Sequence, residues 1–130
     1  MSVIRIGPGA PWEGIVGYSR VVVRGDAAWV SGTTSTVDGV VAHPGDAGAQ
    51  TRQALAIVRE ALERAGFTLN DVVRTRMFVT DISRWEEIGR VHGEVFGDVR
   101  PATSMVQVAA LIDPAMLVEI EAEAVRGAGA

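Results

Sequence analysis

The 130-residue sequence contains no cysteine, which excludes disulfide bonds, thiolate metal sites and cysteine nucleophiles and is typical of a reducing compartment. No apolar run approaches the ~20 residues that a membrane span needs. The segment Met1–Gly7 lacks the apolar core of a signal peptide. We therefore expect a cytoplasmic protein with no membrane partner.

Histidine is almost as scarce as cysteine. His43 and His92 are the two histidines, and two widely separated histidines make a poor metal site. The sequence also has no GxSxG elbow, no phosphate-binding loop of the GxxxxGK[ST] type, no HExxH motif and no GxGxxG after a strand. We therefore expect neither a metal nor a cofactor.

The charges give no sign of a nucleic-acid partner. The chain has 12 basic residues, all arginine, against 16 acidic ones, for a formal net charge of −4, and the arginines are scattered. A hydrophobic content of 48% with 22% charged residues is typical of a folded protein. The length predicts a single domain, 1–130, in which roughly two-thirds of the unfolded surface could be buried.

Two segments have helical periodicity. In the first, Asp46 is the expected N-cap and Gly66 the expected left-handed residue after the last turn. In the second, Ser83 opens a capping-box spacing, and an apolar stripe that includes Trp85 runs to Gly97. Both segments are therefore predicted to be amphipathic helices, each with one face against a core.

Five segments have the composition or alternation of strands: 17–23, 27–33, 72–79, 103–111 and 116–125. Segment 8–14, rich in proline and glycine, is expected to be a loop, and the last two strands are expected to flank a turn at Asp113-Pro114. The order strand-strand-helix-strand-helix-strand-strand predicts an α+β fold with two helices on one face of a sheet. Because segment 103–111 is apolar on both faces, we expect the other sheet face to close against a second subunit.

The last strand carries three glutamates on one face: Glu119, Glu121 and Glu123. Successive carboxylates lie about 7 Å apart, and their burial without water or a hydrogen-bond partner would cost free energy. They either orient a ligand or a water molecule, with backbone N–H groups near Gly32 or 103–105 to stabilise negative charge, or pair with arginines such as Arg74 and Arg76, of the same or a neighbouring chain. We favour pairing for Glu119 and Glu123, and both alternatives stay open for Glu121.

Four stretches of the chain resemble the RidA/YjgF/YER057c/UK114 superfamily: VGYSRVV, WVSGTTS, DVVRTRMFVTDI and RPATSMVQVAALIDPAMLVEIEAEAVR. The resemblance covers about 16–126. It implies a chorismate-mutase-like (YjgF-like) α+β fold, with an about six-stranded mixed sheet and two helices on one face. It also implies a homotrimer with clefts between subunits, and the activity of a cofactor-independent deaminase, a hydrolase that releases ammonia from reactive enamines and imines.

The resemblance also implies a set of site residues. Tyr18 matches a tyrosine of the first strand, and Gly32 matches a glycine that follows a serine in the second. Glu121 matches the glutamate that positions the hydrolytic water, which makes it the expected catalytic residue. Met105 belongs to the expected substrate-binding set.

The chain departs from the family pattern at two positions of that set. Thr103 stands where an arginine is expected to bind the substrate carboxylate, and Gly89 stands where the second helix is expected to carry an asparagine. A threonine offers one hydroxyl instead of a planar guanidinium fork, a loss of about 1.5–3 kcal/mol for such a bond. Arg100 is a candidate substitute.

Two functions therefore remain in view. The trimer hydrolyses or binds an enamine, an imine or a related carbonyl metabolite, with Glu121 positioning the water, or it binds a metabolite without catalysis. A third activity, that of a ribonuclease, is attached to the superfamily by name, and the negative net charge argues against it.

Overall fold

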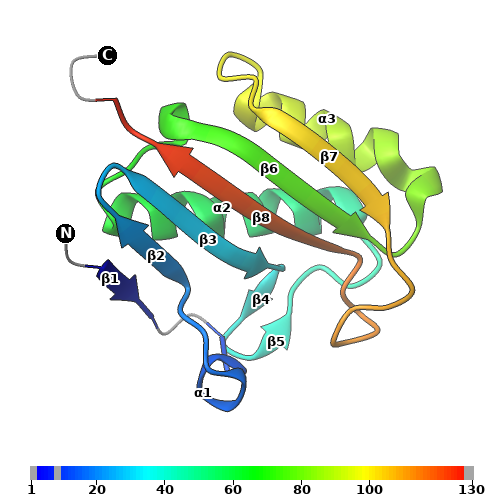
Figure 1. Cartoon of the computed structure of the whole chain (residues 1–130). Coiled ribbons are helices and arrows are strands. Elements are labelled where there is room, and N and C mark those ends of the chain that lie inside the picture. The colour runs from blue at the N-terminus through cyan, green and yellow to red at the C-terminus, as the bar shows by residue number, and fades with distance from the viewer. Residues whose placement is uncertain (1–2, 8–9, 128–130) are drawn as a thin grey trace.

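The computed structural model describes residues 3–7 and 10–127. A six-stranded sheet is covered on one face by two long helices (Figure 1). The elements follow in chain order: β1 Val3–Ile6, α1 Glu13–Val16, β2 Val21–Arg24, β3 Ala27–Thr33, β4 Thr36–Val37, β5 Val40–Val41, α2 Ala47–Arg64, η1 Leu69–Asp71, β6 Val72–Val79, η2 Ile82–Arg84, α3 Trp85–Phe96, β7 Ala102–Gln107 and β8 Val118–Val125. The α+β class, the mixed sheet and the placement of both helices are as predicted.

The strand order is β1-β2-β3-β8-β6-β7, so the last strand lies in the middle of the sheet. β8 is antiparallel to both β3 and β6, and β7 is parallel to β6 at the edge. The predicted pairing of the last two strands around Asp113-Pro114 is therefore wrong. The reason is topological. The helix α3 is a crossover connection between β6 and β7, which makes these neighbours parallel. After β7 the chain passes β6 and enters the sheet again on the other side of it, as β8.

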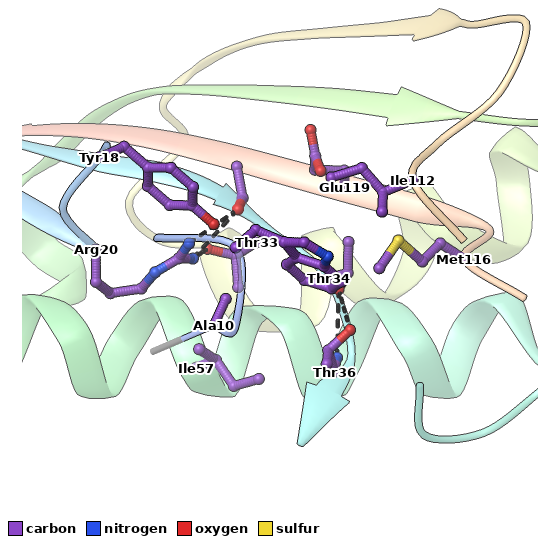
Figure 2. Close-up of a pocket in the computed structure, with 12 residues that line it drawn as sticks. Ala10, Tyr18, Arg20, Thr33, Thr34, Thr36, Ile57, Ile112, Met116 and Glu119 are labelled. Carbon is purple, nitrogen blue, oxygen red and sulfur yellow. Dashed lines mark hydrogen bonds between the residues drawn. The ribbon is translucent and has the colours of Figure 1, made fainter. Parts of the chain in front are cut away.

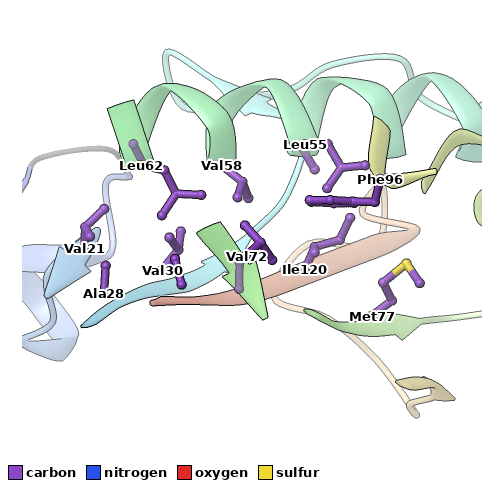
Figure 3. Packing of buried hydrophobic residues seen from close by; sticks show 14 of the residues in the cluster. Val21, Ala28, Val30, Leu55, Val58, Leu62, Val72, Met77, Phe96 and Ile120 are labelled. Atoms are coloured by element: carbon purple, nitrogen blue, oxygen red, sulfur yellow. The ribbon is translucent and has the colours of Figure 1, made fainter. Parts of the chain in front are cut away.

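The helix α2 follows the sequence prediction closely. The side chain of Asp46 accepts a hydrogen bond from the backbone N–H of Ala49 at 3.0 Å, as an N-cap should. Gly66, just past the end, has the predicted left-handed conformation with φ +87°. The inner face of α2 presents Leu55, Val58 and Leu62 to the sheet (Figure 3).

The start of α3 differs from the prediction. Asp81 caps the short helix η2 by accepting from the N–H of Ser83, so Ser83 is not the N-cap of α3. Trp85 is 57% exposed and does not belong to the buried stripe, which consists of Ile88, Val91 and Phe96. The 3₁₀ turn in front of the helix shifts its register and turns the tryptophan outward.

Two short elements near the beginning of the chain were not expected. β1 extends the sheet beside β2, and α1 occupies part of the segment predicted to be a loop. Pro8 and Gly9 of that predicted loop lie outside the described residues. None of the helices in the described part of the chain is long and apolar enough to cross a membrane.

The face of the sheet opposite the helices has no layer over it among the described residues (Figure 1). Large apolar side chains on it are about half exposed: Trp29 at 44%, Val106 at 47% and Val125 at 49%. The glutamates of β8 point to this face, while Val118, Ile120 and Ala122 point to the core, as their alternation predicted. The burial of this face by a second subunit stays a prediction.

Candidate functional site

A small hollow of about 40 Å³ lies where β3 and β8 meet the segment around α1 (Figure 2). We call it the Glu119 hollow. Its polar lining consists of Tyr18, Arg20, Gly32, Thr33, Thr34, Thr36 and Glu119, and its apolar lining of Ala10, Trp12, Ile57, Ile112 and Met116. A hollow of this size within one chain has room for a water molecule or a small ligand group.

Gly32 brings the backbone of β3 close to the Glu119 side chain. The register of β3 against β8 shifts between Val30 and Thr33, so the strand is irregular at this point. A Cβ built at Gly32 would lie 2.7 Å from the Oε2 atom of Glu119, a distance that no real Cβ tolerates. The glycine therefore allows the carboxylate to lie directly against the strand.

The environment of Glu119 alters its acidity. Burial raises the pKa of its carboxyl group above the ordinary 4.5, the negative charge of Glu121 raises it further, and the positive charge of Arg20 partly opposes both. A carboxylate with a raised pKa is a stronger proton acceptor than an exposed one. Glu119 therefore has the character of a general base at the edge of a partly apolar hollow.

Arg20 lies beneath the hollow in a buried ion pair. Its Nε atom is 3.7 Å from Oε2 of Glu13, and the two side chains are only 5% and 8% exposed. Its Nη1 atom donates to the hydroxyl of Thr33 at 2.5 Å and to the carbonyl of Gly32 at 3.2 Å. Arg20 and Glu13 were not singled out from the sequence. The available signal was the position of Arg20 directly before the apolar run Val21–Val23, where a buried charge needs a partner.

Glu121 and Glu123 lie on the open face of the sheet, outside the Glu119 hollow. Arg76 on β6 pairs with both, at 3.2 Å from Glu121 and 3.5 Å from Glu123. All three side chains are between 35% and 48% exposed. The predicted pairing with an arginine of the third β-run is therefore confirmed for Glu123, and Glu121 makes the same contact. Glu119 has no such partner among the described residues of its own chain, so its pairing with an arginine of a neighbouring chain stays a prediction.

Thr103 lies in a second hollow, of about 480 Å³, between the end of α3 and the start of β7. We call it the Thr103 hollow; His92 and Arg100 also line it. The hydroxyl of buried Thr75 is 2.8 Å from the Thr103 hydroxyl and 2.9 Å from Nε2 of His92. Arg100 has a left-handed backbone with φ +54°.

The directions of these hydrogen bonds follow from the single proton on each hydroxyl. Thr103 donates to the carbonyl of Pro101 at 3.1 Å, so it accepts from Thr75. Thr75 has then used its proton and accepts from His92, which fixes the tautomer with the proton on Nε2. Burial also lowers the pKa of His92, which favours the neutral ring.

The remaining predicted site residues, Met105 and Gly89, lie on β7 and α3. Met105 is partly buried and packs against the core from β7. Gly89 lies on α3, where a Cβ would meet only Trp85, at 3.9 Å. Neither residue lines either hollow.

Within one chain, the two hollows bring together only some of the predicted site residues, and Glu121, Met105 and Gly89 line neither. Tyr18 and Gly32 join Glu119 in one hollow, Thr103 lines another, and the two hollows share no lining residue. The described residues contain no group of three or more His, Cys, Asp or Glu side chains that could hold a metal ion.

Comparisons with known proteins agree with the fold. The family model described as endoribonuclease L-PSP matches residues 10–126. The structure of Rv2704 from Mycobacterium tuberculosis, described as a member of the YjgF/YER057c/UK114 family, superposes with a TM-score of 0.87 at 52% identity, covering 96% of this chain and 100% of that one.

Two relatives of known sequence extend the comparison. The uncharacterised protein SCO2049 of Streptomyces coelicolor is 37% identical over 98% of this chain and 95% of its own length. The 3-aminoacrylate deaminase RutC of Acinetobacter baylyi is 41% identical over 62% of this chain and 63% of its own. By the extent of the family match and the identity to these relatives, the chain belongs to the endoribonuclease L-PSP family, the RidA/YjgF/YER057c/UK114 superfamily.

Proposed function

We propose that the protein hydrolyses a small enamine, imine or related carbonyl metabolite in a cleft between the subunits of a homotrimer. The observation that carries the proposal is the half-buried carboxylate of Glu119, with its raised pKa, held against Gly32 in the hollow that Tyr18 also lines. The name of the related Acinetobacter protein, a 3-aminoacrylate deaminase, supports the same reaction class.

The separation of the two hollows supports an assembled site. Thr103 and Tyr18 belong to one expected site but line different hollows in a single chain. In the proposed trimer the open sheet faces close on one another, and the Glu119 hollow of one copy meets the Thr103 hollow of the next. Met105 and Gly89 would then act from the Thr103 side.

The chemistry requires one carboxylate to position the water. Glu121 is the residue that the family pattern suggested, but its carboxylate is 3.2 Å from Nη1 of Arg76 and lies outside the Glu119 hollow. Glu119 combines burial, a raised pKa and contact with the β3 backbone. We therefore propose Glu119 as the general base and keep Glu121 as the alternative.

The proposed reaction uses no cofactor. The enamine tautomerises to its imine, and water, deprotonated by Glu119, forms a C–O bond at the imine carbon while the nitrogen takes up a proton. The resulting carbinolamine loses ammonia as its hydroxyl proton departs, leaving a carbonyl product, and the proton on Glu119 returns to solvent or to the leaving nitrogen. Tyr18 and Thr103 would orient the ligand.

A second candidate function is metabolite binding without turnover. The replacement of the expected arginine by Thr103 favours it, because the substrate would lose a charge-assisted contact. A ribonuclease role, which the family name suggests, has no support in the charge distribution. The net charge is −4, and several arginines outside the Glu119 hollow pair with carboxylates, among them Arg52, Arg59, Arg84 and Arg126.

The test is ammonia release from imines formed in situ. We expect the protein to accelerate ammonia release from 2-aminoacrylate or from its uncharged amide analogue. Glu119→Gln should lower the rate by at least ~100-fold, the usual scale of a general base, and Glu121→Gln by much less. A Glu121 variant that loses more activity than the Glu119 variant would restore the alternative assignment. If ammonia is released at the same rate with and without the protein, and the ligand still binds saturably, the hydrolase function is wrong and metabolite binding without turnover remains.

A further inference from the structure

The ion pair between Arg20 and Glu13 sets the charge of the Glu119 hollow. The two side chains are only 5% and 8% exposed, and Nε of Arg20 is 3.7 Å from the Glu13 carboxylate. Glu13 therefore offsets part of the charge of Arg20, and the part that remains opposes only partly the effect of burial on the Glu119 carboxyl group. Arg20 and Glu119 are the two charged groups among the residues that line the hollow, and the charge of Arg20 is partly offset.

The guanidinium of Arg20 is also committed to the protein backbone. Its Nη1 and Nη2 atoms both donate to the carbonyl of Gly32 at 3.2 Å, and Nη1 donates to the Thr33 hydroxyl at 2.5 Å. Arginine recognises a carboxylate by presenting two parallel N–H groups from its planar fork. Here that fork faces the irregular part of β3, so it is not presented to a ligand.

The remaining edge of the guanidinium is no more accessible. The Nε atom is buried and makes no hydrogen bond among the described residues, while it lies within ion-pair distance of Glu13. The guanidinium carbon lies 5.8 Å from the centroid of the Tyr18 ring, on the same side of the hollow (Figure 2). An incoming carboxylate would thus find no free N–H pair on Arg20 and would approach Glu119.

The other walls add no cation. Ile57, Ile112 and Met116 are apolar, and Thr34 and Tyr18 offer hydroxyl groups, which bind neutral carbonyl or amide groups well. Burial of a carboxylate in such surroundings without a paired cation costs several kcal/mol. A neutral ligand incurs no such cost.

We propose that the Glu119 hollow takes an uncharged ligand, an imine, ketone or amide that carries no carboxylate, and that Arg20 is a positioning residue that holds the Gly32 backbone. This inference rests on the proposed ligand site and names its substrate class. Arg20 acts through the backbone of β3, and Glu13 offsets part of the charge of the guanidinium.

The first test compares a matched pair of stable ligands, 2-oxobutanamide and 2-oxobutyrate, by titration calorimetry on the assembled wild-type protein. We expect the amide to bind at least about tenfold more tightly, which corresponds to about 1.4 kcal/mol. Equal or tighter binding of 2-oxobutyrate overturns the proposal. This holds even if Arg100 of the Thr103 hollow is the residue that binds the carboxylate. Failure of both ligands to bind overturns it as well.

The second test removes the neutralising charge. Glu13→Gln preserves the side-chain shape but leaves Arg20 with an uncancelled charge, so the affinity for 2-oxobutyrate should rise about tenfold while that for the amide changes little. Glu63→Gln is the control, because it removes the same charge from an exposed ion pair with Arg59. An unchanged preference in Glu13→Gln overturns the role of the ion pair. If that variant does not fold, the wild-type comparison alone decides.

These results are separable from the proposed hydrolysis. Ligand preference is measured by binding, so a clear preference for the amide without any ammonia release removes the hydrolase function and leaves this inference standing. If the protein releases ammonia from 2-aminoacrylate as fast as from its amide, the hydrolase function stands and the preference for an uncharged ligand is wrong.

Discussion

The carboxylate of Glu119 occupies the space into which a side chain at Gly32 would point: a Cβ there would lie 2.7 Å from Oε2 and 2.8 Å from Cδ of Glu119. Gly32 does not have a positive φ, so its need for glycine comes from this contact and not from the backbone conformation. Gly32→Ala should therefore displace the Glu119 carboxylate from the hollow. We expect ligand affinity or turnover to fall at least about tenfold with a small change in stability, measured by calorimetry and urea denaturation.

A matched control for that variant is Gly14→Ala. Gly14 lies in α1, and a Cβ there would meet nothing within 4 Å. The variant should keep ligand binding unchanged and gain up to about 1 kcal/mol from the helix propensity of alanine. If both alanine variants bind ligand as the parent does, the contact between Gly32 and Glu119 has no role in the site.

The raised pKa of Glu119 gives a pH-dependent stability prediction. A carboxyl group whose pKa is higher in the folded than in the unfolded state favours folding when it is protonated, and this contribution is lost as pH rises through the folded pKa. Glu119→Gln should therefore be more stable than the parent at neutral pH, and the difference should shrink as pH falls toward the ordinary value of 4.5. Urea denaturation of both proteins over this range measures the effect. A parent that is more stable than the variant at neutral pH would contradict the assignment.

Local patterns in the sequence predicted the secondary structure well. The alternation in segment 118–125 and the caps of α2 are decided by neighbours within a few residues, and both were correct. β3 and β6 matched their predicted bounds because β-rich runs end at clear breaks. The pairing of β7 with β6 was missed because strand partners depend on the crossover through α3, which no local pattern encodes.

The site was predicted less completely than the fold. Tyr18 and Gly32 were identified from the family resemblance and lie together, but Glu119 was assigned to pairing and Glu121 to chemistry. Residues two apart in a strand share a face, so alternation alone cannot say which of them lies over a bulge and which meets an arginine. Arg20 was missed because its partner Glu13 lies in a segment that was predicted to be a loop.

Thr75 joins the Thr103 hollow to α3 through its hydroxyl, which is fully buried. Thr75→Val keeps the shape but removes both hydrogen bonds and leaves His92 without its Nε2 partner. We expect a loss of about 1–3 kcal/mol in the free energy of unfolding by urea denaturation. Thr103→Val, on an exposed side chain, should cost less. Nitrogen NMR of His92 should find the Nε2–H tautomer in the parent and a mixture in Thr75→Val; an Nδ1–H tautomer in the parent would contradict the bonding scheme.

The open face of the sheet predicts that assembly depends on Val106. This side chain is 47% exposed on β7, so Val106→Asp removes little packing from the single chain and should leave its fold intact. In the proposed trimer the new carboxylate would be buried on a face that already holds Glu119, Glu121 and Glu123. Desolvation and like-charge repulsion should weaken association at least ~100-fold, or about 2.7 kcal/mol.

Light scattering after size-exclusion chromatography, over a range of concentrations, measures this change. Val40→Asp is the control, because Val40 is 68% exposed on the separate β4–β5 hairpin and its change adds the same charge outside the six-stranded sheet. Dissociation of Val106→Asp together with loss of ligand binding would mean that the ligand needs residues from two copies. If Val106→Asp stays associated, the prediction that Val106 lies in the interface is wrong. If it dissociates and still binds ligand as the parent does, the Glu119 hollow is sufficient within one chain and the composite cleft is wrong.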